Sequence, residues 1–221
     1  MFEVELRGTW LVARFPRRQR FLSWAVVGGF VHEGDTVVWH EVTNAELPIG
    51  MDPGALLAGW LKGAGFPSNA LGFLTSARLD RHGIASWAAG GVAASCVATV
   101  GLSNARRPGD PTSAQPCHLG TINLLVATDC PLSMRAMVET VALAAEARAV
   151  AVLEAGTVSP VTGLAASGTG TDCIAVAAPL GASELAYAGK HTAMGECVGR
   201  AVLEAVGPLA RRALAARAGG P

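Results

Sequence analysis

The stretch Thr121-Ile-Asn-Leu-Leu-Val-Ala-Thr128, followed at once by Asp-Cys-Pro-Leu-Ser133, decides the fold class of this 221-residue chain. The almost unbroken apolar run predicts a strand that is buried on both faces. The proline and serine after it predict a helix, because serine caps helix N-termini and proline is common near a helix start. We expect that helix to end at Gly156. A second apolar run, Cys173–Ala178, predicts another buried strand before a last helix that begins near Thr192.

The first fifty residues alternate apolar and polar positions, which is typical of strands with one exposed face. We expect an antiparallel meander of three strands at Thr9–Phe15, Phe21–Val27 and Thr36–Val42. Turns are expected at Gly28-Gly29 and at Glu33-Gly34-Asp35, because glycine adopts the positive φ angles of tight turns.

A helix should follow the meander, with Asp52 as its cap and Pro53 at its first position. Strands are expected at Leu71–Thr75 and Val92–Leu102, and the apolar run from Gly83 to Gly101 reads as buried strand. The proline-containing segment Asn104–Gly120 should form a long loop.

These elements predict one α+β domain that spans residues 1–221, with residues 1–50 as the meander and 51–221 as the core that carries the site. We expect mixed, largely antiparallel sheets flanked by helices. In the helix after Ser133, one side should carry apolar residues: Met134, Met137, Val138, Val141, Ala145, Ala149 and Val152.

The composition narrows the function classes. The chain has 17 basic and 17 acidic residues, so nothing indicates a nucleic-acid partner. No apolar stretch is long enough to span a membrane, and no signal peptide is visible. Five cysteines without short paired spacing favour reduced thiols in the cytoplasm. Zinc, phosphate-loop and nucleophile-elbow motifs are absent from the sequence, so we expect no metal and no cofactor.

Polar residues next to the buried strands are the candidate site. Asn104 and Arg106 follow the strand that ends near Leu102, where an amide could donate to an oxyanion or simply cap a turn. Asn123 lies inside a buried strand, so its amide should either tie the core together or line a pocket.

The stretch Gly168-Thr169-Gly170-Thr171-Asp172 comes directly before the second buried strand. Backbone N–H groups of such a turn can bind an anion or an oxyanion, although an ordinary tight turn explains the pattern equally well.

A third polar stretch precedes the last helix and contains Lys190, His191 and Glu196. Imidazole titrates near neutral pH, so His191 could act as a general acid or base.

In this order, these stretches resemble the adenosylcobinamide amidohydrolase family. The resemblance rests on Thr99–Asp110, Gly120-Thr-Ile-Asn123, Glu146-Ala-Arg148, Ser167–Asp172 and Ala188–Glu196. It implies a hydrolase that cleaves the aminopropanol amide of adenosylcobinamide to give adenosylcobyric acid during cobalamin salvage. The corrinoid is then the substrate and not a cofactor. Whether the chain forms a homodimer is left open.

Two segments, Gly120–Leu132 and Ser167–Gly170, are also similar to self-processing serine aminopeptidases. That second resemblance implies a layered α/β/β/α sandwich. Two other functions stay open: a self-processing aminopeptidase-like amidase that acts on small peptides, and a corrinoid-binding protein without catalysis.

For amide hydrolysis we assign proton transfer to His191, oriented by Asp172 or Glu196. Lys190, Asn104 and Asn123 would stabilise the oxyanion or hold the corrin amides. Thr75 and Ser76, at a strand end, are the hydroxyl candidates for a covalent intermediate, and an activated water is the alternative.

Overall fold

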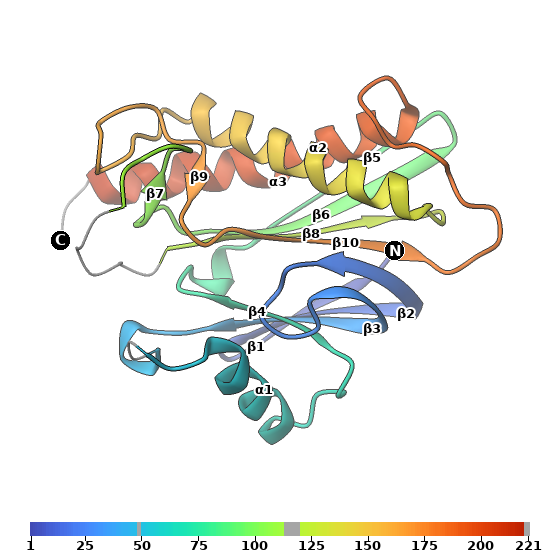
Figure 1. Cartoon of the computed structure of the whole chain (residues 1–221), viewed down its shortest axis with the longest axis horizontal. Helices are drawn as coiled ribbons and strands as arrows, with labels where there is room; N and C mark the ends of the chain where they lie inside the picture. The colour runs from blue at the N-terminus through green and yellow to red at the C-terminus, as the bar shows by residue number, and fades with distance from the viewer. Residues whose placement is uncertain (48–49, 113–119, 219–221) are drawn as a thin grey trace.

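The computed structural model describes residues 1–47, 50–112 and 120–218 (Figure 1). Its strands are β1 Glu3–Arg7, β2 Trp10–Ser23, β3 Phe30–Glu41, β4 Leu71–Thr75, β5 Gly83–Ala89, β6 Val92–Val100, β7 Ala105–Arg106, β8 Ile122–Thr128, β9 Gly168–Thr169 and β10 Cys173–Pro179. Its α-helices are α1 Pro53–Gly63, α2 Met134–Glu154 and α3 Ala193–Ala218, and two short 3₁₀ turns cover Asn44–Glu46 and Leu79–Arg81.

The main sheet has the strand order β4-β3-β2-β10-β8-β6-β5, with β1 paired to β2. The pairs β8–β10 and β3–β4 are parallel, and the other pairs of this sheet are antiparallel. Strands β7 and β9 form a separate two-stranded ribbon. The predicted α+β class with a mixed, largely antiparallel sheet is therefore confirmed.

The sheet folds back on itself, so that its two halves lie face to face. Figure 1 shows α2 and α3 above β5, β6, β8 and β10, with β1–β4 below them and α1 underneath. Buried side chains from both halves, among them Trp39 and Phe73 from one and Leu125 and Ala175 from the other, form the central core. Separate cores lie beneath α2 and α3 and above α1. The layers follow the α/β/β/α order that the resemblance implied.

Strand β2 joins the two halves and corrects the predicted meander. The expected strands Thr9–Phe15 and Phe21–Val27 belong largely to one strand, whose pairing with β3 shifts between Arg14 and Gln19. Its first part pairs with β1, and its last residues pair with β10. A single irregular strand can therefore serve both layers, because a bulge bends the strand and increases its twist.

The turn predicted at Glu33-Gly34-Asp35 is wrong, because these residues lie inside β3. A Cβ on Gly34 would lie 2.7 Å from the backbone oxygen of Asn69, so glycine is needed there for close packing. The turn predicted at Gly28-Gly29 is confirmed, with Gly28 at a φ of +69°.

The segment from Gly83 to Gly101 is a hairpin and not one buried strand. Gly90 and Gly91, both with positive φ, connect β5 to β6. Strand β5 lies at the sheet edge, and its residues alternate between exposed and half-buried. Small residues at most of its positions concealed this alternation in the sequence.

The helix starts are confirmed, but the inward side of α2 is not the predicted one. Asp52 accepts a hydrogen bond from the Gly54 backbone N–H, and Ser133 accepts one from Ala136. Met134 and Val138 are 42% and 55% exposed. The buried face of α2 consists mostly of small residues: Ala136, Met137, Thr140, Leu143, Ala144, Ala147, Ala151 and Val152. Alanines allow this helix to pack closely against its neighbours.

The loop predicted over Asn104–Gly120 contains the short strand β7 at its start. Residues 113–119, which include Cys117 and His118, lie outside the described residues. None of the helices in the described part of the chain is long and apolar enough to cross a membrane.

Buried His40 should make the stability of the fold depend on pH. Its ring stacks on Trp10 with centroids 3.8 Å apart, and burial lowers its pKa below the ordinary value of 6.5. Below that pH the unfolded chain binds protons more readily than the folded protein. The free energy of unfolding should therefore fall on acidification and level off below the folded-state pKa.

Urea unfolding at about pH 7.5 and about pH 5.5 measures this loss. The variant His40→Phe keeps an aromatic ring against Trp10 and should lose less stability than the wild type. The exposed His191→Gln variant serves as the control and should lose as much as the wild type. An equal loss in His40→Phe and wild type would contradict the assignment.

Candidate functional site

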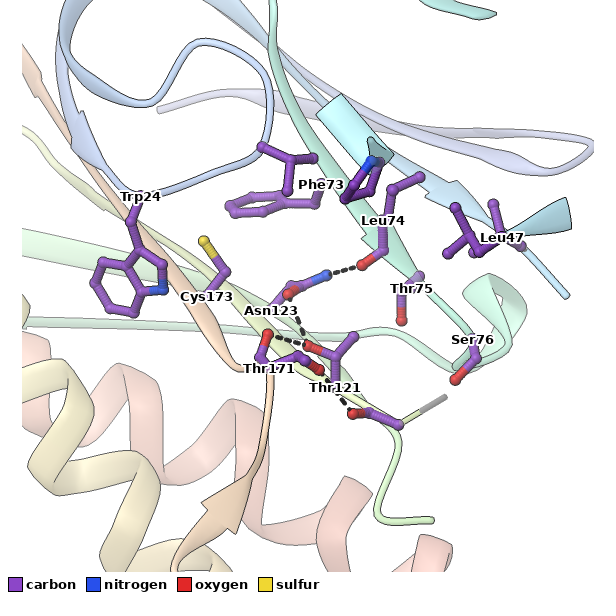
Figure 2. A pocket seen from close by; sticks show the side chains of 14 residues that line it. Trp24, Leu47, Phe73, Leu74, Thr75, Ser76, Thr121, Asn123, Thr171 and Cys173 are labelled. Carbon is purple, nitrogen blue, oxygen red and sulfur yellow. Dashed lines mark hydrogen bonds between the residues drawn. The ribbon is translucent and has the colours of Figure 1, made fainter. Parts of the chain in front are cut away.

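A cavity of about 290 Å³ opens between the two sheet layers, at the starts of β8 and β10 and the end of β4. Figure 2 shows it from close by. Its lining is mostly apolar with a group of hydroxyls and one amide: Trp24, Val26, Val42, Leu47, Pro53, Phe73, Leu74, Thr75, Ser76, Gly120, Thr121, Asn123, Thr171 and Cys173. No charged residue and no histidine occurs among these lining residues.

Strand β8 supplies the polar floor of the cavity. Thr121 and Asn123 are two residues apart and therefore project on the same side of the strand. The Asn123 amide donates to the Leu74 backbone oxygen at 2.7 Å, which links β8 to β4 across the two layers (Figure 2). Asn123 is only 2% exposed. Both expectations for this buried amide hold, because it ties the layers together and lines a pocket.

The Thr121 hydroxyl lies 2.8 Å from the Thr171 backbone oxygen and 3.3 Å from the Asn123 side-chain oxygen. The Thr171 hydroxyl in turn donates to the Gly120 backbone oxygen at 3.0 Å. These bonds join the segments that enter β8 and β10, so the floor is a connected polar network.

Thr75 and Ser76, the predicted hydroxyl candidates, both line the cavity. Thr75 is the last residue of β4, and its backbone oxygen accepts from the Val42 N–H at 2.8 Å. Its hydroxyl accepts from the Ala77 N–H at 3.0 Å, and its side chain is almost fully buried. Ser76 is half-buried beside it.

Asp172 holds the segments around the cavity together but does not itself line it. Its carboxylate accepts from the Ile122 backbone N–H at 2.9 Å and from the backbone and hydroxyl of Thr169. It also forms an ion pair with Arg148 of α2, in which the two side chains are only 17% and 9% exposed. Its backbone oxygen accepts from the Trp24 indole N–H at 2.9 Å.

The predicted binding residues Asn104, Arg106 and Gly168–Thr171 are brought together by the β7–β9 ribbon. Arg106 of β7 pairs with Gly168 of β9, and the Gly170 N–H donates to the backbone oxygen of Asn104 at 3.3 Å. A Cβ on Gly168 would overlap both side chains of the Arg148–Asp172 ion pair, so glycine is required there. Of this group only Thr171 lines the cavity, and the others lie outside its lining.

Lys190, His191 and Glu196 lie elsewhere. The start of α3 packs near Gly90 and Val92, as shown by the Cys197 thiol 3.5 Å from the Val92 oxygen. This is the opposite end of β6 from Val100, which pairs with Ile122 beside the cavity.

Lys190 pairs with Glu146 of α2, and both side chains are more than half exposed. His191 and Glu196 are exposed as well. The structure does not bring His191 beside Asp172, whose carboxylate is occupied by Arg148, Thr169 and Ile122. The role of His191 in proton transfer stays a prediction.

Sequence reasoning missed Thr121 and Cys173 as cavity residues, and it did not single out Trp24. The period of two along a strand could have found Thr121, because it shares a face with the predicted Asn123. Cys173 follows Asp172 directly. For Trp24 the sequence holds no such signal, since its exposure depends on how the end of β2 meets β10.

Burial raises the pKa of the Cys173 thiol to about 11, and the nearby Ser23 hydroxyl lowers it only in part. The thiol is therefore almost entirely protonated at neutral pH, and only the thiolate is strongly nucleophilic. Across residues 1–47, 50–112 and 120–218, no group of three His, Cys, Asp or Glu side chains could hold a metal ion.

Comparison with known families decides where this fold belongs. Residues 2–218 match the family model described as adenosylcobinamide amidohydrolase, CbiZ. The chain belongs to this family. Its members are named as amidohydrolases that act on adenosylcobinamide, so this chain is a hydrolase of corrinoid salvage.

Among solved structures, one similar chain has low sequence identity to this protein. The PH0078 protein from Pyrococcus horikoshii OT3 is 14% identical, with a TM-score of 0.42. The alignment covers 93% of this chain and 81% of that one. Comparison with the curated proteins finds no match.

Removing the Asp172 carboxylate should destabilise this CbiZ protein strongly. Asp172→Ala leaves the Arg148 guanidinium buried without its partner, and we expect a loss of about 3 kcal/mol in the free energy of unfolding. Asp80→Ala is the matched control, since its ion pair with Arg78 is 47–63% exposed and screened by solvent, so its loss should destabilise the protein far less. Urea unfolding compares the two, and similar losses would contradict this role for Asp172.

The protonated thiol of Cys173 predicts that it is not the nucleophile. Cys173→Ala should retain most of the hydrolase activity at pH values on either side of neutrality. Complete loss of turnover in a variant that still unfolds at the wild-type urea concentration would refute this prediction.

Proposed function

We propose that this protein hydrolyses the amide that joins the aminopropanol arm of adenosylcobinamide to the corrin, giving adenosylcobyric acid and free aminopropanol. The observation that supports this is the cavity itself. Its walls are apolar and its floor carries hydroxyls and an amide, with no charged side chain or histidine among the lining residues. Such a lining suits an uncharged amide-bearing arm.

The Asn123 amide is positioned to recognise the scissile group. One of its two N–H groups donates to the Leu74 oxygen, which fixes the plane of the side chain. In our proposal the second N–H donates to the substrate carbonyl and stabilises the oxyanion as the carbon becomes tetrahedral. An oxyanion donor of this kind typically contributes about 10²–10³ in rate.

The attacking oxygen comes from Thr75, Ser76 or a water molecule beside them. The Thr75 hydroxyl accepts an N–H bond from Ala77, and such a bond favours the alkoxide form over the neutral form. Attack forms a bond to the amide carbon, the C–N bond breaks, and the leaving amine takes the proton that the attacking hydroxyl or water loses. If a hydroxyl attacks, water then hydrolyses the ester that it forms.

The test incubates the full-length protein with adenosylcobinamide and follows aminopropanol and adenosylcobyric acid by mass spectrometry. We expect release by the wild type, and a loss of at least about 100-fold in kcat for the variant of the attacking hydroxyl, Thr75→Val or Ser76→Ala. If neither variant is affected, water is the nucleophile. Asn123→Leu should lose about 10²-fold or more.

The variant His191→Ala tests whether proton transfer depends on the exposed stretch at the start of α3 or on groups at the cavity. Retained turnover would leave proton transfer to groups at the cavity, whereas loss with a changed pH profile would support His191. Corrinoid bound without release of aminopropanol would favour a binding protein. Cleavage of the protein into two chains on a denaturing gel would favour a self-processing amidase.

A further inference from the structure

The size of the cavity limits which part of a corrinoid can enter it, if the proposed function holds and a corrinoid is the substrate. Pockets that enclose drug-sized ligands have volumes of about 300–1,000 Å³. This cavity, at about 290 Å³, lies at the bottom of that range. A corrin macrocycle with its peripheral amide arms is larger than a drug-sized molecule. One arm can therefore enter, while the ring stays at the mouth.

Trp24 presents a flat apolar surface at that mouth. It lines the cavity and is 49% exposed, whereas Trp39 is fully buried in the central core. Its indole N–H donates to the Asp172 backbone oxygen at 2.9 Å, so the ring cannot turn without breaking this bond. Figure 2 shows Trp24 on one side of the cavity and Leu47 on the other.

The residues beside Trp24 continue the apolar rim from separate segments. Val26, which lies with Trp24 in the connection between β2 and β3, is 46% exposed. Leu47, which precedes α1, and Pro53, the first residue of α1, also line the cavity. This connection is held in place, because the Gly72 N–H donates to the Val27 oxygen at 2.9 Å. The rim residues are therefore uncharged, and the part that carries Trp24 and Val26 is held in place before a ligand binds.

We propose that Trp24 is the stacking platform for the corrin ring and determines the selectivity of the enzyme for corrinoid amides over small amides. The ring lies against the exposed indole face while one arm passes into the cavity towards Asn123 and Thr75. A rigid aromatic surface gains contact area at low entropic cost, because few rotamers must be fixed on binding. The amide arm is then bound inside the cavity, and the macrocycle is bound at its mouth.

The first experiment measures kcat and KM for adenosylcobinamide with Trp24→Ala and Trp24→Phe. Trp24→Ala should raise KM by about 10- to 100-fold with little change in kcat, and Trp24→Phe should recover much of the loss. Trp87→Phe is the control, since Trp87 lies on the edge strand β5 and packs against Arg200. An unchanged KM in Trp24→Ala, or a loss confined to kcat, would overturn the proposal.

Two further substrates identify what stacks on the indole. Cyanocobinamide lacks the adenosyl group, so an equal effect of Trp24→Ala on it places the corrin ring on Trp24. An effect that disappears with cyanocobinamide would mean that adenine stacks there and would overturn the proposal. N-(2-hydroxypropyl)propanamide mimics the arm alone, and its slow cleavage should be insensitive to Trp24.

Binding keeps this proposal separate from the proposed function. Equilibrium dialysis of cyanocobinamide, read by its absorbance, should show weaker binding to Trp24→Ala even if the protein releases no aminopropanol. That combination would refute the hydrolase function and retain the platform. Equal binding by the wild type and Trp24→Ala would refute the platform whatever the activity.

Discussion

The carboxylate of Asp172 joins the parts of the chain on which the cavity depends. The carboxylate binds the backbone at the start of β8, strand β9 and the Arg148 guanidinium of α2. The backbone oxygen of Asp172 accepts a hydrogen bond from the Trp24 indole. A carboxylate so little exposed is stable only when charge and hydrogen bonds compensate its desolvation. The glycine at position 168 is a consequence, because a side chain there would overlap the ion pair. This network positions the site and does not itself perform the chemistry.

A second constraint comes from the contact of two sheet layers. A buried amide between them needs a hydrogen-bond partner, and one N–H of Asn123 finds it in the Leu74 oxygen of the facing layer. Where the layers separate at the starts of β8 and β10, the cavity opens. Its hydroxyls come from both layers, Thr75 and Ser76 from one and Thr121 from the other. Catalysis in this fold can therefore use groups that are distant in sequence and adjacent across the opening.

The CbiZ family match and the fold explain why the resembling motifs lie far apart in the chain. Asn104, Gly120–Asn123, Arg148 and Gly168–Asp172 come together at one end of the sheet. The motif with Lys190 contacts α2 through Glu146, on the outer side of the helical layer. Sequence order alone suggested one site, and the structure divides these residues between two places. The cavity has the lining expected for an amide arm, and the exposed stretch has the titratable groups.

The sequence by itself determined the class of fold, the starts of α1 and α2, the two buried strands β8 and β10 and, through its motifs, the family. The elements follow from local chemistry, because apolar runs, caps and glycines act on their immediate neighbours. It could not determine that Phe21 and Trp10 share one long strand, that Gly34 serves packing and not a turn, or which side of alanine-rich α2 is buried. Only the tertiary structure decided these points and placed Trp24 at the cavity mouth, because each depends on contacts between residues remote in the chain.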